Sequence, residues 1–478
     1  MICDQQGVVD IIFYYKQYRI VSNDIITQAF AFKSLTGVSA DVKFKDCCSV
    51  KKGLPMSVFD EFTWREMVYD ATEDLPEVLF KEKITAYIGF DPSASSLHVG
   101  SFLPIMGLVH LQRYGHSPIA IVGGGTGLIG DPSGKAQERP LITSEEVEAN
   151  LRGIREQLSR FLDFNSTTNP ALMINNADWL CNLKMLDFLR DIGKYFSVNY
   201  MIAKESVKRR LEQEEGLSFT EFSYLMLQAY DFLYLFDHYN CTLQMGGSDQ
   251  WGNITAGMDL IRRLRGKKAH CLVFPLVTTS SGTKFGKTEQ GTVWLDANRT
   301  SPFRFYQFWI NTDDKDVITY LKFFTLLNKT EIRELEEVVT TCPEKREAQR
   351  KLAQEATKLV HGDNALRGAE SASQVLFGDE ISNLTLQEVL DIFADVPSCK
   401  LEKPDLSGDG TLLVDLLVSA QLAQSKSEAR RLIQGGGVYL NNVRTTDVQR
   451  KVSLPETIEG QILVLRKGQK EYRLVQIV

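Results

Sequence analysis

From about Met56 to Thr300 the chain alternates short apolar runs with longer stretches of helical spacing. Residues 145–162 place apolar side chains at the intervals of an amphipathic helix, and the apolar runs have the length of buried strands. The predicted strands are ITAYIGF, PIAIVGG, ALMINN, TLQMGG and CLVFPLV. Strand and helix in regular alternation predict a parallel sheet covered on both faces. We therefore expect an α/β, Rossmann-like domain over residues 56–300.

Beyond residue 300 the pattern changes twice. Residues 301–399 have almost continuous helical spacing, clearest in EKREAQRKLAQEATKLVHG, and predict an all-α domain. Residues 400–410, KLEKPDLSGDG, combine proline, glycine and charge, which is typical of a linker. Residues 411–478 then predict a small α+β domain, in which a helix leads through three glycines into the strand VYLN.

Residues 1–55 differ from the rest, because they show no sustained period and hold three of the eight cysteines. Their early apolar stretch is interrupted at Asp10 and lacks a cleavage site, and the segment contains five Asp and one Arg. These features disfavour both a secretory signal and a transit peptide. Two interpretations stay open: an upstream extension that is not made, with Met56 as the start, or an appendage peculiar to this chain. We favour the first.

Length and charge narrow the classes of protein. The 478 residues suffice for about three domains, at roughly 100 to 200 residues each. A net charge of −7 argues against a polyanion-binding surface over the whole molecule. Residues 411–478, however, hold ten Lys or Arg against six Asp or Glu, so a basic module follows an acidic body. That asymmetry is typical of a nucleic-acid contact, although a merely solvated surface would also show it.

The cysteines and the apolar runs indicate the compartment. No two cysteines form a CxxC pair, so we expect reducing surroundings, no disulfide framework and no structural zinc. No apolar run reaches the roughly 18 residues that a membrane helix needs. We expect a cytoplasmic protein without a membrane contact.

The glycine cluster GGGTGLIG, residues 123–130, follows a predicted strand and contains GxGxxG, the pattern of a dinucleotide site. That fingerprint needs a helix running on from the third glycine, and Asp131 and Pro132 break it. As a phosphate loop, the segment ending at Lys135 is one residue short, and Ala136 occupies the position of the magnesium-binding Ser or Thr. The sequence therefore disfavours both stock nucleotide motifs.

Two further elements suit the binding of phosphate groups. His98 and Gly100 lie between the first predicted strand and a helical run, where backbone N–H groups attract phosphate and glycine permits close approach. Lys284 and Lys287, in KFGKT, predict a mobile cationic loop that can neutralise charge on a triphosphate. Taken singly, each has an ordinary alternative: a capping or packing histidine, and a solvated surface loop.

Together these elements, 186 residues apart with a parallel sheet between them, resemble the paired signatures of class I aminoacyl-tRNA synthetases. From about Met56 to Val478 the chain resembles the bacterial tyrosyl enzymes, through GFDPSASSLHVG, GDPSGK, SFTEFSYLMLQAYDF, GGSDQWGNITAG and KFGKT. The resemblance implies activation of L-tyrosine by ATP with Mg²⁺, transfer of the tyrosyl group to tRNA(Tyr), and a homodimer. It implies no metal ion held by the protein itself.

On the amino-acid side, the resemblance adds to what the spacing shows. Tyr224, Gln228 and Asp231 are spaced i, i+4 and i+7, so their polar groups share one face of an otherwise apolar helix. By resemblance, Tyr87 and Asp231 would bind the phenolic hydroxyl of tyrosine. Asp131, Tyr224 and Gln228 would bind its α-ammonium group. Without the resemblance, the less favoured alternative is that the helix-face residues are core polar groups that satisfy one another.

The resemblance also assigns residues to ATP and to tRNA. The catalytic residues at the phosphates would be Ser93, His98, Lys135, Arg139, Lys284, Lys287 and Thr288. The remaining ATP contacts would come from Asp91, Gly100, Ser101, Gly247, Asp249 and Gln250, together with Lys284. The phosphates of tRNA would meet Lys426, Arg430 and Arg431, on a helix of an RNA-binding module that resembles one in a ribosomal protein and in pseudouridine synthases.

Ser101 departs from the family pattern, which often has a second histidine at this position. A serine hydroxyl can still form a hydrogen bond with a ribose. Two rival interpretations remain. A tryptophan-specific synthetase is disfavoured by Tyr87 and Asp231, and a non-catalytic RNA-binding relative predicts more damage to the site than Ser101 alone.

Overall fold

The computed structural model describes most of the chain beyond residue 55. The described residues are 56–133, 143–212, 216–280, 282, 285–288, 291–376, 381, 384–393, 396–406, 408, 410–468 and 471–478. Residues 56–478 form one unit of the chain. Residues 1–55, for which the sequence leaves two interpretations open, lie outside the described residues.

A six-stranded sheet forms the centre of the first domain, in the order β1-β6-β5-β2-β3-β4. The strands are β1 (Asp70–Ala71), β2 (Thr85–Phe90), β3 (Ser117–Val122), β4 (Leu172–Asn175), β5 (Cys241–Gly247) and β6 (His270–Phe274). The five strands that the sequence predicts run parallel, and only the short β1 pairs antiparallel, with β6. The expected Rossmann-like α/β fold is confirmed.

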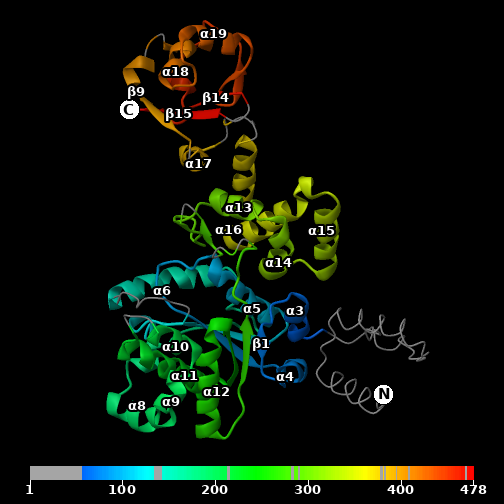
Figure 1. Cartoon of the computed structure of the whole chain (residues 1–478), viewed down its shortest axis with the longest axis vertical. Coiled ribbons are helices and arrows are strands. Elements are labelled where there is room, and N and C mark those ends of the chain that lie inside the picture. Colours follow the sequence, from blue (N-terminus) through cyan, green and yellow to red (C-terminus); the bar gives the residue numbers. More distant parts are fainter. Residues whose placement is uncertain are drawn as a thin grey trace, which may run out of the picture. The chain divides into compact units, whose positions relative to one another are not determined.

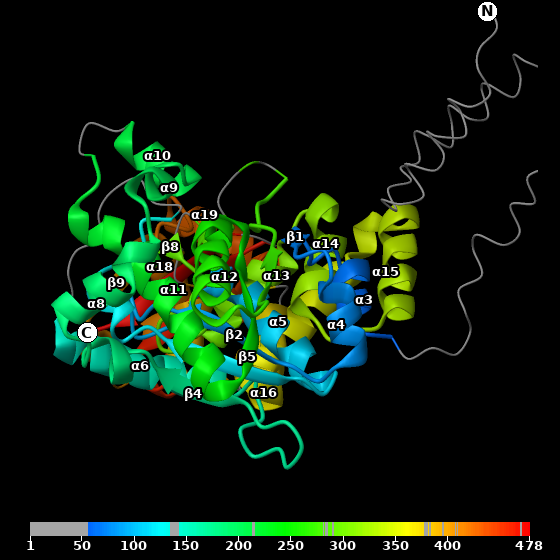
Figure 2. The ribbon, with the colours of Figure 1, turned by 90° about the horizontal axis from the view of Figure 1, so that it is seen from below.

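Helices cover both faces of this sheet (Figure 2). They are α3 (Val58–Trp64), α4 (Leu75–Lys81), α5 (Phe102–Arg113), α6 (Ser144–Leu158), α7 (Ala177–Leu180), α8 (Met185–Asp191), α9 (Val198–Ile202), α10 (Glu205–Leu211), α11 (Phe219–Tyr239) and α12 (Trp251–Arg265). Successive side chains of a strand point to opposite faces. In β3, Ala120 and Val122 therefore pack into one buried cluster with α5, whereas Ile119 and Ile121 pack into a second with α11 and α12.

Helices also dominate the described residues from 302 to 392, as their spacing predicts (Figure 1). They are α13 (Pro302–Ile310), α14 (Asp314–Phe324), α15 (Lys329–Thr341), α16 (Glu347–Leu376) and α17 (Leu386–Ile392). α13 packs along α16, and α14 packs against both α16 and α5. Gly362, with a φ of +84°, interrupts the helical path of α16, because this backbone conformation favours glycine.

The last domain contains a five-stranded sheet in the order β12-β11-β14-β15-β9. Its elements are β9 (Ser398–Leu401), β10 (Thr411–Leu412), α18 (Leu413–Ser419), α19 (Lys426–Gln434), β11 (Val438–Leu440), β12 (Val443–Thr445), β13 (Lys451–Val452), β14 (Ile462–Lys467) and β15 (Glu471–Ile477). β9 pairs in parallel with β15, so residues 400–410, expected to be a linker, begin inside this sheet. Only Cys399 and Leu401 of β9 point toward the core, which is too short a pattern to be recognised in the sequence.

A shared buried cluster joins the helical and C-terminal domains. It includes Phe303 of α13, Val375 of α16, Val464 of β14 and Leu474 of β15. Because packing crosses the expected boundaries, we propose that the C-terminal domain begins by β9 rather than at residue 411. In the described part of the chain, no helix is both long and apolar enough to cross a membrane.

Candidate active site

Several of the predicted site residues that the structure describes lie in or directly after β2 and β5. From these adjacent strands the sheet extends through β3 and β4 on one side and through β6 on the other. Such a switch in direction leaves a crevice at the strand ends, where ligands of α/β sheets bind. Tyr87 lies in β2 and Asp91 directly follows it, while Gly247 ends β5 and Asp249 lies in the next 3₁₀ turn, Ser248–Gln250.

Asp231, on α11, is a buried carboxyl with two hydrogen-bond donors. Its Oδ1 accepts from Nε1 of Trp179 at 2.7 Å, and its Oδ2 accepts from Nδ2 of Asn176 at 2.8 Å. Burial raises the pKa of Asp231 to about 8, and the nearby charge of Asp91 adds to that rise, although both hydrogen bonds oppose it. The group therefore lies in a dry environment with two preset donors.

The hydroxyl of Tyr87 is buried and has no hydrogen-bond partner among the described residues. Burial, and then the charge of Asp231, raise the pKa of this hydroxyl well above its ordinary value. A buried hydroxyl without a partner costs free energy unless a ligand forms a hydrogen bond with it. The charge of Asp231 acts on this hydroxyl, so the two groups that the resemblance assigns to the phenolic hydroxyl of tyrosine are neighbours in the structure.

Asn176 and Trp179 are site residues that the sequence analysis missed. Asn176 directly follows β4, so the rule that polar residues collect at strand ends could have identified it. Its Nδ2 also donates to Oγ1 of Thr126 at 2.9 Å, which extends the network from Asp231. Trp179 carries no comparable signal, because an indole in a sequence does not show where its N–H points.

Tyr224 and Asp91 belong to the same network. The Tyr224 hydroxyl donates to Oδ2 of Asp91 at 3.2 Å, and Oγ1 of Thr126 donates to its Oδ1 at 3.1 Å. Polar groups from β2, α11 and the glycine cluster are therefore linked in one chain of hydrogen bonds. Gly123 must be glycine here, since a Cβ would lie 2.4 Å from the Thr126 hydroxyl and 2.5 Å from Oδ1 of Asp91.

A second network joins the other residues predicted at the α-ammonium group. Oδ2 of Asp131 accepts from Nε2 of Gln250 at 2.7 Å. Oε1 of Gln228 accepts from Nδ2 of Asn253 at 3.0 Å, and the same amide donates to Oε1 of Gln250 at 3.1 Å. Asp131, Gln228 and Gln250 are thus brought together through Asn253. This asparagine lies in the GGSDQWGN motif, but the sequence analysis did not predict it as a site residue.

The glycine cluster itself does not open a long helix. Within residues 123–130 the chain makes only a 3₁₀ turn, Thr126–Leu128, and Gly130 has a φ of +87°. This confirms that the GxGxxG match is not a dinucleotide fingerprint.

His98 lies at the predicted junction between strand and helix. It precedes the 3₁₀ turn Val99–Ser101 and α5, and its Nδ1 accepts a hydrogen bond of 2.9 Å from the N–H of Gly100. A neutral His98 that makes this bond carries its proton on Nε2. Gly100 is required, since a Cβ would lie 2.6 Å from the imidazole. Ser101 makes no capping bond with its side chain, and Ser93 is exposed on the loop after β2.

Backbone hydrogen bonds connect the segment that follows the second signature to the first signature. Lys287 and Thr288 form strand β7 (Lys287–Thr288), which pairs with β8 (Gly291–Thr292). Farther along, the N–H of Leu295 donates to the carbonyl of Leu97 at 2.9 Å, next to His98. Three predicted phosphate contacts, Lys135, Arg139 and Lys284, lie outside the described residues.

The basic residues predicted to meet tRNA lie on α19. Arg430 and Arg431 are exposed. Lys426 is also exposed but forms an ion pair of 2.8 Å with Asp415. An exposed pair of this kind is weak, so a phosphate could compete for the lysine.

The switch-point crevice, the His-Val-Gly junction and the adjacent KFGKT segment define a class I aminoacyl-tRNA synthetase. The family model described as "tRNA synthetases class I (W and Y)" matches residues 80–378, and "Tyrosine--tRNA ligase SYY-like C-terminal domain" matches residues 388–475. The chain belongs to the tyrosine–tRNA ligase family.

Named relatives support this assignment over most of the chain. The tyrosine–tRNA ligase of Roseiflexus castenholzii is 57% identical over 88% of this chain and 100% of its own length. That of Bacillus caldotenax is 54% identical with the same coverage. A C-terminally truncated mitochondrial tyrosyl-tRNA synthetase from Aspergillus nidulans has a TM-score of 0.62 at 31% identity, covering 69% of this chain and 96% of that one.

Proposed function

We propose that this chain activates L-tyrosine with ATP to give tyrosyl-adenylate and pyrophosphate, and then transfers the tyrosyl group to the 3′ end of tRNA(Tyr). The observation that carries the proposal is a pair of buried groups: Tyr87, whose hydroxyl has no partner among the described residues, and Asp231, with two preset donors. The carboxylate of tyrosine attacks the α-phosphorus itself, so no side-chain nucleophile is needed. The protein contributes positioning and stabilisation of charge.

The phenolic hydroxyl of tyrosine would bond to Tyr87 and Asp231. Phenylalanine would leave both groups buried without that partner, which disfavours it. Asp131, Tyr224 and Gln228 would bind the α-ammonium group, and their clustering with Asp91 and Gln250 supports this role. An indole offers no hydroxyl to the same pair, which disfavours tryptophan.

The ATP side of the site would be formed around the two signatures. The phosphates would be bound by Ser93, His98, Lys135, Arg139, Lys284, Lys287 and Thr288. The remaining contacts would come from Asp91, Gly100, Ser101, Gly247, Asp249 and Gln250. Among the described residues, no three His, Cys, Asp or Glu side chains gather as a metal site. We propose that Mg²⁺ enters with the triphosphate as part of the substrate.

Exposed apolar side chains support a homodimer. They lie on α8 to α11, which follow one another in the sequence: Met185, Leu186, Val198, Ile202, Leu211 and Phe219. Phe219 is 72% exposed, and a subunit interface would remove apolar side chains such as these from water. Light scattering after chromatography tests it: Phe219→Glu should give monomers, whereas Phe80→Glu, exposed on α4, should not. Dimers from both variants would contradict the proposed surface.

The deciding experiment is amino-acid-dependent ATP–pyrophosphate exchange without tRNA, with tyrosine, phenylalanine and tryptophan compared. Exchange with tyrosine alone is expected. Exchange with tryptophan alone would favour the tryptophan-specific rival. Folded protein that supports no exchange but binds tRNA would favour a non-catalytic RNA-binding relative. A cytoplasmic location is part of the proposal and is tested by fractionation of the cells that make the protein.

A further inference from the structure

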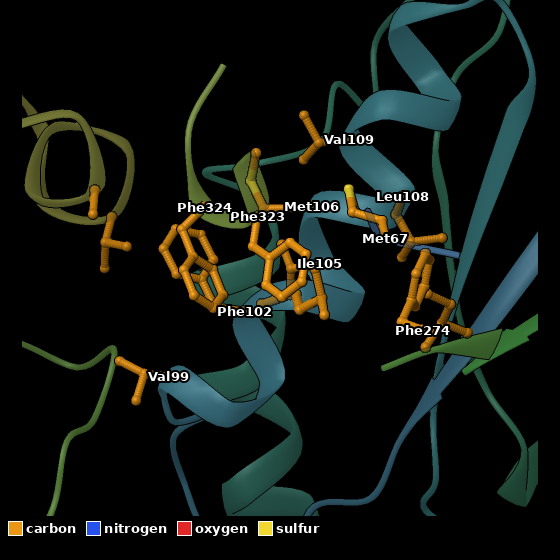
Figure 3. Packing of buried hydrophobic residues seen from close by; sticks show 14 of the residues in the cluster. Met67, Val99, Phe102, Ile105, Met106, Leu108, Val109, Phe274, Phe323 and Phe324 are labelled. Atoms are coloured by element: carbon orange, nitrogen blue, oxygen red, sulfur yellow. The ribbon is translucent and has the colours of Figure 1, made fainter. Parts of the chain in front are cut away.

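One phenylalanine ring of the helical domain contacts KFGKT and also the residue that follows the His-Val-Gly-Ser element. Phe324, the last residue of α14, stacks on Phe102 with ring centroids 5.4 Å apart and planes inclined by 21° (Figure 3). It also stacks on Phe285 of KFGKT, at 5.4 Å and 3°. Phe102 directly follows Ser101 of the His-Val-Gly-Ser element, so one ring joins elements that are far apart in the sequence.

The three rings belong to a buried aromatic cluster. Phe102 and Phe324 are fully buried, and Phe285 is only 6% exposed although it lies within a charged, glycine-containing motif. Phe285 also contacts the rings of Trp309 and Tyr320, with centroids 5.9 and 5.1 Å away. Stacked and edge-on aromatic pairs contribute beyond the area that they bury. The cluster therefore fixes Phe285, within a motif that the sequence predicts to be a mobile loop.

Backbone contacts place the same segment against His-Val-Gly. The N–H of Val99 donates to the carbonyl of Val293 at 3.0 Å, and the N–H of Val293 donates to the carbonyl of Gly286 at 3.0 Å. A Cβ on Gly286 would lie 2.5 Å from Cγ2 of Val99. The residue after Phe285 therefore rests on the first signature, and a shift of Phe285 would disturb that contact.

We propose that Phe324 is a positioning residue for adenylate formation, which acts through Phe285 to hold residues 285–288 against the His98 signature. The helical domain would thereby take part in the activation of the amino acid. This inference rests on the proposed function and deepens it. Phe324 lies in the core and acts only through the rings that it contacts. Cations stabilise the charge on the leaving pyrophosphate best when they are held in position before the reaction. If the segment after Phe285 moves more freely, we therefore expect the rate of adenylate formation to fall.

The test compares Phe324→Leu with Phe323→Leu. Phe323 is 5% exposed on the same helix, and among the described rings it contacts only Phe324, edge-on at 6.0 Å. Both variants keep an apolar side chain, but only Phe324→Leu removes the stacked contacts with Phe102 and Phe285. For Phe324→Leu we expect kcat/KM for ATP to fall about five- to tenfold, with KM for tyrosine within about twofold of wild type. Phe323→Leu should change neither by more than about twofold.

Hydrogen exchange at the Val293 amide gives a second measurement that needs no activity. We expect Phe324→Leu to accelerate this exchange markedly more than Phe323→Leu does, because the amide bonds to Gly286 next to Phe285. Equal exchange in the two variants, or a KM for tyrosine that rises with the KM for ATP, would overturn the positioning role. A wild-type protein without tyrosine-dependent pyrophosphate exchange would instead refute the proposed function, and hydrogen exchange would still decide the role of Phe324.

Discussion

Nε1 of Trp179 donates a hydrogen bond of 2.7 Å to Oδ1 of Asp231, 52 residues away in the sequence. This bond orients the Asp231 carboxyl. It also offsets part of the free energy that burying the carboxyl costs. The indole also stacks on Tyr234, with centroids 4.3 Å apart, so its position is set on two sides. The proposed binding site for the phenolic hydroxyl of tyrosine thus depends on the Trp179 indole as well as on the Asp231 carboxyl.

Replacing Trp179 by Phe keeps an aromatic ring and removes the donor to Asp231. A hydrogen bond to a charged or buried carboxyl is worth about 1.5–3 kcal/mol, so KM for tyrosine should rise by about tenfold or more. Pyrophosphate exchange at varied tyrosine concentration measures the effect. Tyr234→Phe, which keeps the stacked ring, is the control and should leave KM unchanged. Equal KM values for the Trp179→Phe variant and wild type would show that the bond does not position Asp231.

Asp231 should make the stability of the protein depend on pH. Its pKa is about 8 in the folded protein, against an ordinary value of 3.8, so the folded state keeps a proton that the unfolded chain has lost between these pH values. Stability therefore falls as pH rises from about 4 to 8. Asp231→Asn should raise Tm relative to wild type at pH 8, and the difference should shrink toward pH 5. Tyrosine-dependent exchange should be lost.

Thermal unfolding across this pH range, without substrates, checks that prediction. Asp178→Asn, a change at an exposed carboxylate on α7, is the matched control and should follow the wild-type curve. A constant Tm difference between the Asp231→Asn variant and wild type from pH 5 to 8 would mean that Asp231 is already ionised in the folded protein.

Arg65→Met should destabilise the protein strongly. The buried guanidinium forms a 2.7 Å ion pair with Glu61 and donates to the carbonyls of Lys322, Thr325 and Leu327 after and within the end of α14. Removing one partner of a buried pair costs about 3–5 kcal/mol, because the other charge is left uncompensated. Urea unfolding measures the loss. Lys322→Met breaks only a contact with Glu66 and should cost less than about 1 kcal/mol.

Arg430→Gln combined with Arg431→Gln should weaken the charging of tRNA and spare activation. Both side chains are exposed on α19, and phosphate contacts of this kind carry a salt-dependent part of the affinity. We expect a higher KM for tRNA and a shallower salt dependence, with unchanged pyrophosphate exchange. Lys426→Gln should have a smaller effect, because it removes one exposed positive charge where the double variant removes two. Equal loss of both activities would contradict an RNA-binding role for α19.

Much of the fold follows from local patterns. The strands β2 to β6 can be predicted from their apolar runs, because strands buried on both faces must be apolar along most of their length. Tyr224, Gln228 and Asp231 could be placed on one helix face because helical spacing is fixed by backbone geometry. Strand β9 could not be predicted, since its four residues form a strand only by pairing with β15.

Local patterns are therefore enough to predict the parallel α/β domain, the helical region after it and the segments that carry the signatures. Which of these segments meet is set by the folded arrangement of the chain. The bonds from Asn176 and Trp179 to Asp231 and the stack of Phe102, Phe324 and Phe285 join parts of the chain that no local pattern connects. The physical reason is that backbone periodicity sets the face on which a side chain lies, whereas its partner is chosen by the packing of whole elements.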